Sequence, residues 1–216
     1  MPCKSPSSYA FAIAAALLSL LAAASAGAFP GDFDPTFAGD GIVDDPSASR
    51  GYGVAIQADG KILVAAGSDF AVFRYDETGS LDGGFGTGGR ATASFGGTSE
   101  VATAVAAAPG GKVLVSGWIV TGSNDVELAI ARFDSTGTLD PTFGTGGMTT
   151  TVLPSGSGYT DFVAVLPSGR IITGGNSSVV SGVLVAYDDD GHLDVGFGMG
   201  GIVELFGVSI GGITVT

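Results

Sequence analysis

The chain has few of the residues on which most hydrolases and metalloproteins rely. Its 216 residues include one cysteine, one histidine and one tryptophan, and charged residues make up 13%, where about 25% is usual. The single cysteine, Cys3, precedes an apolar run and leaves with that run if it is cleaved. The remaining chain would then have no thiol, which excludes disulfides and cysteine-bound metal.

The sequence also lacks any stretch of sustained helical periodicity with capping residues at both ends. Glycine is abundant instead, at 38 of 216 residues, against an average usage of about 7%. It occurs without a collagen period and alongside many Val, Ile and Phe residues, which favours short strands joined by tight turns. We therefore expect an all-β fold.

The N-terminus is typical of a targeting segment. Lys4 supplies a positive start, residues 10–24 form an apolar run of 15 residues, and small residues follow at Ala24, Ala26 and Ala28. The run is short for a membrane span, which needs about 20 apolar residues. We expect residues 1–28 to be a signal peptide cleaved after Ala26 or Ala28, with no membrane span once it is removed. The product would be secreted, periplasmic or displayed at the cell surface.

The cleaved chain would be strongly acidic. Seven Lys and Arg residues remain against 21 Asp and Glu residues, which gives a net charge of about −14. Nucleic acids and anionic membranes are bound through basic patches, so this balance disfavours both as partners.

A nine-residue phrase recurs four times and divides the chain into units. Its second residue is always Asp (Asp34, Asp82, Asp140 and Asp194), at steps of 48, 58 and 54 residues. Self-similarity with a period of this size indicates a repeat architecture. The copies are FDPTFAGDG (residues 33–41), LDGGFGTGG (81–89), LDPTFGTGG (139–147) and LDVGFGMGG (193–201).

The phrase has the composition of a chain corner. Its Asp can accept hydrogen bonds from its own backbone, and its glycines can adopt positive φ. We expect its aromatic residue to be buried at an equivalent corner in each copy, at Phe37, Phe85, Phe143 and Phe197. A ligand-binding loop is the alternative, but no copy ends in the Lys-Ser/Thr pair of a phosphate-binding loop.

Between the phrases, each unit contains a hairpin pattern, then a strand that ends in an aromatic residue and Asp. A further short strand follows each phrase, and this gives four strands in about 50 residues. Such a unit predicts a four-stranded antiparallel blade of a β-propeller-like array occupying residues 29–216. Propellers typically have four to eight blades, so three units and a partial fourth predict an open arc. The expected units are residues 41–82, 89–140 and 147–194, with a partial fourth at 201–216.

The composite pattern resembles the delta-60 repeat family. The hairpin turn Asp59-Gly60-Lys61, the strand end Arg74-Tyr75-Asp76 and the phrase that follows carry this resemblance, which extends over nearly all of the chain from residue 33 onward. It implies a propeller fold in an exported bacterial protein and implies no reaction. The sequence departs from the pattern at Ala186, which replaces the arginine of the earlier units, and at Ala38, which replaces a phrase glycine.

The acids near the last phrase are the only metal-site candidates. Asp188, Asp190 and Asp194 gather beside Gly191, and carboxylate oxygens are preferred calcium ligands. The equivalent loops of the earlier units carry fewer acids, so a solvated turn is the alternative that we favour. We expect folding to require neither calcium nor any cofactor.

Other polar residues offer two interpretations each. Arg74 and Arg132 could present an exposed pair to a carboxylate or glycan, or each could form an internal fork to a nearby Asp. Trp118 could be a sugar platform or part of the core. His192 is the lone histidine and no G-x-S-x-G motif is present, so we assign no catalytic residue.

These observations favour an exported, non-catalytic repeat scaffold that acts as an interaction or cell-surface module. Its partner would be a protein or an extracellular polymer, and open blades would allow self-association or continuation of the repeat array. The alternative is a propeller enzyme or glycan-binding protein that uses carboxylates in a central funnel. A deep central pocket lined with converging carboxylates would favour that alternative.

We predict that the exported protein begins at Gly27 or Phe29. The apolar run ends at two overlapping small-x-small sites, which a signal peptidase recognises. Intact-mass spectrometry of the exported protein would measure this, and a mass that retains residues 1–24 would contradict it.

Overall fold

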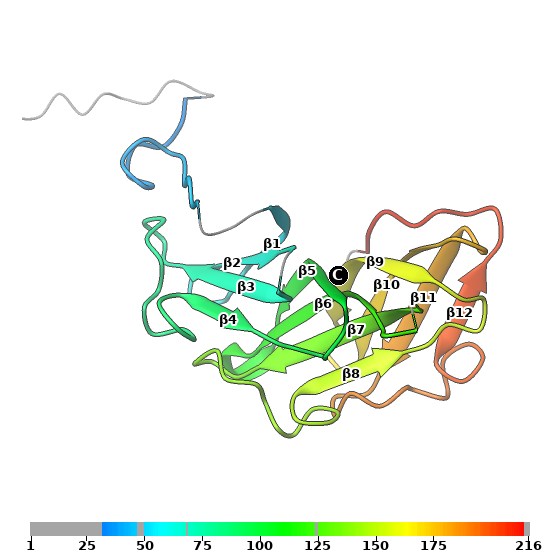
Figure 1. Ribbon diagram of the computed structural model, residues 1–216. Coiled ribbons are helices and arrows are strands. Elements are labelled where there is room, and N and C mark those ends of the chain that lie inside the picture. The colour runs from blue at the N-terminus through cyan, green and yellow to red at the C-terminus, as the bar shows by residue number, and fades with distance from the viewer. Residues whose placement is uncertain (1–31, 47–49, 68, 124, 214–216) are drawn as a thin grey trace, which may run out of the picture.

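The computed structural model describes residues 32–46, 50–67, 69–123 and 125–213; the expected signal peptide, residues 1–28, lies outside them. These residues form three four-stranded antiparallel sheets and no α-helix, only one short 3-10 turn, η1 (Pro109–Gly111). The expected all-β fold is confirmed (Figure 1). The strands are β1 (Gly51–Ile56), β2 (Ile62–Ala66), β3 (Ala71–Tyr75), β4 (Arg90–Thr92), β5 (Ser99–Ala107), β6 (Val113–Val120), β7 (Val126–Phe133), β8 (Met148–Thr151), β9 (Gly158–Val165), β10 (Ile171–Ser177), β11 (Gly182–Tyr187) and β12 (Ile202–Leu205).

Each sheet is a simple meander in which neighbouring strands pair in chain order. We call the sheets blade 1 (β1 to β4), blade 2 (β5 to β8) and blade 3 (β9 to β12). The first strand of blade 2, β5, packs against the first strands of the other two blades, β1 and β9. The blades therefore follow one another as an array, and the array does not close into a ring.

The unit boundaries differ by one strand from those expected. The strand after each phrase was expected to open a unit, but β4, β8 and β12 pair with β3, β7 and β11 and so close the preceding blade. In blade 1 the phrase holds β4 beside β3. Asp82 and Gly89, near its two ends, both form backbone hydrogen bonds with Arg74 on β3, so the chain turns back along that strand. The expected partial fourth unit, residues 201–216, is corrected accordingly: β12 belongs to blade 3, and residues 206–213 contain no strand.

A β-bulge marks the first strand of every blade. The register between the first and second strands shifts at Tyr52, Thr103 and Asp161. Such a bulge adds one residue to a strand and increases its local twist. At the central blade the bulge also joins two sheets, since the Thr103 hydroxyl donates to the backbone carbonyl of Thr160 on β9.

The hydrophobic core consists of two layers between the blades. One layer joins blades 1 and 2, and the other joins blades 2 and 3. Blade 2 is therefore covered on both faces, and six consecutive residues of β7 are buried. Large apolar side chains of the two layers include Leu63, Phe70, Phe85, Ile119 and Phe133 in the first, and Leu128, Ile130, Phe143, Ile171 and Tyr187 in the second.

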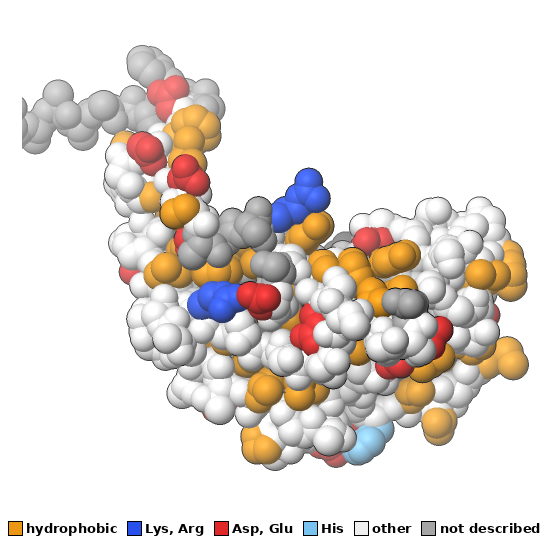
Figure 2. Space-filling model, viewed as in Figure 1, with side chains coloured by type: hydrophobic (Ala, Val, Ile, Leu, Met, Phe, Trp, Pro, Cys, Tyr) orange, Lys and Arg blue, Asp and Glu red, His pale blue; other side chains and the backbone are white. Residues whose placement is uncertain are grey.

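The outer face of blade 1 remains partly uncovered. Val54 and Ile56 are 68% and 69% exposed, whereas Val105 and Val163, which stand at the position of Val54 in the next two blades, are 7% and 9% exposed. Val43, from the segment before blade 1, covers another part of this face. In the view of Figure 2, Lys and Arg side chains are few, and those that are visible lie over blade 1.

The aromatic corners are fully buried only where they lie between two complete blades. Phe85 and Phe143 are fully buried, as expected. The expectation is wrong for Phe37 and Phe197, which are half-buried. Phe37 precedes the first complete sheet, and Phe197 has no fourth blade beside it among the described residues, so each ring lacks half of its surroundings.

We predict that Phe143→Ala lowers the free energy of unfolding by about 3–5 kcal/mol, as expected for removal of a buried aromatic side chain. The matched variant Phe197→Ala, in the same phrase, should cost about half as much because its ring is half-exposed. Chemical denaturation of both variants measures this. Equal losses would contradict the role of the following blade.

Candidate functional site between the blades

The sequence-predicted arginines lie inside the interblade corners. Arg132, on β7, is 2% exposed. Its Nε donates to Asp140 Oδ2 at 2.9 Å, and one Nη donates to Thr142 Oγ1 at 3.0 Å. The other Nη donates to the backbone carbonyl of Asp189 in blade 3 and, at 3.1 Å, to its Oδ1. The guanidinium also stacks over the Phe143 ring at 4.8 Å.

Arg74 repeats this arrangement between blades 1 and 2. Its Nε donates to Asp82 Oδ2 at 2.9 Å, and its Nη1 donates to the carbonyl of Ser135 in blade 2 at 2.8 Å. Its guanidinium lies 4.3 Å from the centre of the Phe85 ring. We call each set of contacts an arginine clamp. Because both arginines are buried, the internal fork is the correct interpretation, and neither is available to an external carboxylate or glycan.

Blade 3 has no arginine clamp. Ala186 occupies the arginine position, and Asp194 of the last phrase pairs with Arg170 from the β9–β10 turn. That pair corresponds to Lys112 with Asp140 in blade 2, at 2.8 Å. The departure from the repeat pattern thus coincides with the blade that has no successor among the described residues.

Backbone contacts complete each corner. The N–H that follows the phrase aromatic donates to a turn carbonyl of the next blade, from Gly86 to Thr136 at 2.6 Å and from Gly144 to Asp190 at 2.7 Å. Gly137 is required for this approach, since it has a φ of +83° and a Cβ there would lie 2.5 Å from the Gly86 nitrogen. The turn glycine Gly137 and the phrase glycine Gly86 that it meets therefore serve packing between blades.

The calcium candidates do not share a site. Asp188 Oδ1 accepts the backbone N–H groups of Asp190 and His192, at 3.0 and 2.9 Å, and Asp194 pairs with Arg170. No group of three or more acidic or histidine side chains in the described part of the chain is arranged to hold a metal ion. The contacts of Asp188 are those of a turn in which the acid binds its own backbone.

Asp76 and Asp134 form the same turn in the earlier blades. The hydroxyls of Thr78 and Thr136 donate to them at 2.7 Å. These side-chain hydrogen bonds lower the pKa of both carboxyls. The recurring acids of the turns are thus used to fix the backbone.

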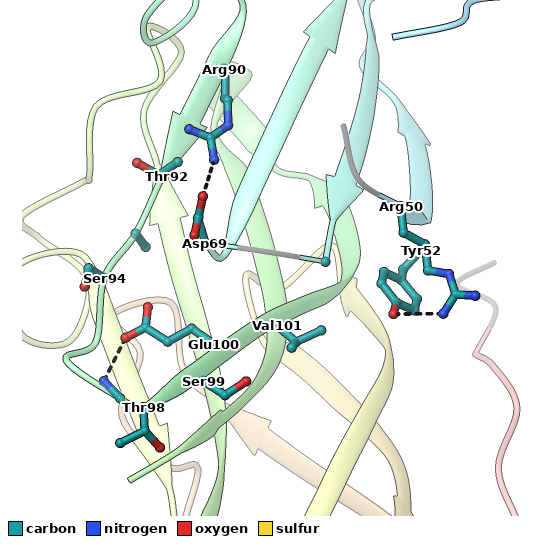
Figure 3. Close-up of a pocket in the computed structure, with 13 residues that line it drawn as sticks. Arg50, Tyr52, Asp69, Arg90, Thr92, Ser94, Thr98, Ser99, Glu100 and Val101 are labelled. Atoms are coloured by element: carbon teal, nitrogen blue, oxygen red, sulfur yellow. Dashed lines mark hydrogen bonds and ion pairs between the residues drawn. The ribbon is translucent and has the colours of Figure 1, made fainter. Parts of the chain in front are cut away.

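A hollow of about 740 Å³ opens between blades 1 and 2 (Figure 3). It is lined by the start of β1, the residues before β3, the end of β4 and the start of β5. Figure 3 shows Arg50 and Tyr52 on one side and Arg90 with Asp69 across from them. Sequence reasoning missed this site because its residues come from four separate segments and form no motif.

The charges in the hollow balance. Arg90 donates to Asp69 Oδ2 at 3.0 Å. Glu100 Oε1 accepts the backbone N–H groups of Phe95 and Gly97 at 2.9 and 2.8 Å. Arg50 lies 5.5 Å from the centre of the Tyr52 ring. The hollow therefore contains two arginines and two acids. Asp69 is paired with Arg90 and Glu100 binds backbone N–H groups, so the carboxylates do not converge as they would in a catalytic funnel.

Trp118 and His192 lie outside this hollow. Trp118 is half-buried and makes an edge-to-face contact with Tyr159, with ring centres 5.4 Å apart. The His192 side chain is 71% exposed and its Nδ1 lies 3.5 Å from Asp188. His192 lines a second hollow, of about 600 Å³, whose other polar side chains are Ser and Thr hydroxyls.

Two segments of the chain match one family model. Residues 57–85 and 109–143 match a β-propeller domain of unknown function, DUF5122. The protein has a β-propeller-like fold. The matched segments run from the first hairpin turn to the phrase aromatic in blades 1 and 2. They include both clamp arginines and their phrase aspartates, whereas Asp189, which Arg132 contacts in blade 3, lies outside them. Comparison with curated proteins finds no match. No helix among the described residues is long and apolar enough to cross a membrane.

Asp140 provides a test of the clamp. Burial raises the pKa of this carboxyl, but hydrogen bonds from Lys112 and Thr142 and the charge of Arg132 outweigh burial and hold the pKa well below its usual range. A group with a lowered folded-state pKa stabilises the protein above its unfolded pKa of about 3.9 and loses that contribution as the pH falls through the folded value.

We predict that Asp140→Asn costs about 3 kcal/mol at pH 7, as expected when one partner of a buried ion pair is removed. Its stability should then fall less than that of the unmodified protein between pH 5 and pH 2. The matched variant Asp194→Asn should cost at most about 1 kcal/mol at pH 7, because its partner Arg170 is exposed. Urea denaturation across this pH range measures both effects, and parallel pH curves for Asp140→Asn and the unmodified protein would contradict the assignment.

Proposed function

We propose that the protein is an exported, non-catalytic repeat scaffold of the delta-60 type that acts as an interaction module outside the cell. The observation that carries this proposal is the use of the repeated residues. The arginine, aspartate and aromatic residue of each complete clamp bind one another or the next blade. The repeat therefore builds a scaffold, and recognition is left to residues that do not repeat.

The surroundings of the titratable groups support a non-catalytic role. General acid–base catalysis needs a group within hydrogen-bond reach of the reacting atoms and with a pKa near the working pH. In the hollow, Asp69 is paired with Arg90 and Glu100 binds backbone N–H groups. No specific observation favours the enzyme alternative.

Composition supports a location outside the cytoplasm. The apolar run of residues 10–24 has the length of a signal segment, and Cys3 lies on its N-terminal side. The remaining chain is acidic, which disfavours nucleic acid and favours solubility in the periplasm or medium. A partner protein or a neutral extracellular polymer is consistent with this charge.

The proposal is tested with the full chain expressed in a Gram-negative host, beside a control chain that lacks residues 2–28. We expect the full chain in the periplasm or medium and the control in the cytoplasm. The purified protein, mixed with soluble polysaccharides, should bind without releasing reducing ends. Retention of the full chain in the cytoplasm would contradict export, and reducing-end release that increases with protein concentration would contradict a non-catalytic role.

A further inference from the structure

We propose that the hollow between blades 1 and 2 binds a short segment of a neutral polysaccharide. This inference rests on the proposed function and names the ligand of the interaction module. The hollow, at about 740 Å³, has the size of known small-molecule sites, which span about 300–1,000 Å³. It therefore has room for a few sugar rings.

Hydroxyl groups dominate the polar lining. Thr92, Ser94 and Ser99 line the hollow and are exposed. Within the described chain their hydroxyls have no hydrogen-bond partner, so each is free to donate to a ligand and to accept from it. The hydroxyl groups of a sugar can likewise both donate and accept hydrogen bonds. The hydroxyls that line the hollow can therefore pair with those of a sugar.

Arg90 supplies a further donor. It uses one Nη for Asp69 and its Nε is buried away from the hollow, so the other Nη is the group left to donate to a ligand. The Asp69 side chain is 74% exposed, so its carboxylate can still accept a hydroxyl. A guanidinium beside a carboxylate thus presents donors and acceptors to neighbouring hydroxyls of one sugar ring.

The balance of charge selects a neutral polymer. Arg50 and Arg90 are offset by Asp69 and Glu100, all of which line the hollow. The chain as a whole carries a formal charge of −13. An anionic polymer would meet repulsion from the whole molecule without a net positive site to compensate it.

Tyr52 provides an apolar surface for the ring. It is 49% exposed, and it packs against Gly67, where a Cβ would lie 2.3 Å from the tyrosine ring. The absence of a side chain at Gly67 thus lets the ring rest against the end of β2. Arg50 Nη1 donates to the Tyr52 hydroxyl at 3.4 Å, which leaves that hydroxyl able to donate to a ligand. The exposed part of the ring offers an apolar surface on which the C–H face of a sugar ring packs.

The corresponding place between blades 2 and 3 differs. Val152 stands where Ser94 stands, and Leu153, where Phe95 stands, is 2% exposed and packs against Gly158. An apolar side chain therefore replaces a free hydroxyl there. The proposed site belongs to one interblade junction and is not a property of the repeat.

The experiment uses the full mature chain and affinity gel electrophoresis with soluble xylan, galactomannan, β-glucan or dextran in the gel, and with anionic alginate. We expect retardation by at least one neutral polymer and none by alginate. Tyr52→Ala and Arg90→Gln should each weaken that binding at least tenfold. Arg170→Gln, an arginine variant outside the hollow, should bind as the unmodified protein does.

Thermal melting of every variant checks that it is folded. If Arg90→Gln does not fold, Arg50→Gln, at an exposed residue of the hollow, replaces it in the binding test. Undiminished neutral-polymer binding by the hollow variants would overturn this inference and leave the interaction module intact. Preferred binding of alginate, or no binding to any of the polymers, would also overturn it. Release of reducing ends would instead contradict the proposed function.

Discussion

The structure depends on covering both faces of each apolar sheet with a neighbouring sheet. Strands such as β7 are buried along most of their length, and they satisfy that need because blade 2 lies between the other two. Burial of apolar surface is the main favourable term in folding. Where the neighbour is missing, as at Val54 and Ile56, the same kind of side chain is left in solvent.

The arginine clamp adds specificity to this packing. A buried guanidinium has a large desolvation cost, which only several hydrogen bonds can offset. Arg132 meets that condition through Asp140, Thr142 and Asp189, and the last of these belongs to the next blade. The clamp therefore fixes how one blade sits on another. In blade 3 an alanine replaces the arginine, which avoids a buried charge without a partner.

The repeated residues hold the blades together, whereas the residues available for binding do not repeat. The repeated acids, arginines and aromatic rings are engaged in corners and turns, and substitution there would disturb packing before it disturbed recognition. Arg50, Tyr52 and Arg90 have no part in the clamps, because Arg50 precedes β1, Tyr52 is near the start of β1 and Arg90 is at the start of β4, where the hollow opens.

The sequence by itself determined the strands, the repeat and the corners, because these depend on neighbours in the chain. The glycines after Phe85 take positive φ, and Asp134 binds the backbone of its own turn, so local composition was enough to recognise both. The tertiary structure decided which blade each short strand completes, which phrase aromatics are buried and where the hollow lies. β4 was assigned to the wrong blade because hydrogen bonds between strands leave no local signal. Phe143 and Phe197 share a motif but differ in burial, because the covering surface comes from the next blade, about 50 residues further along the chain.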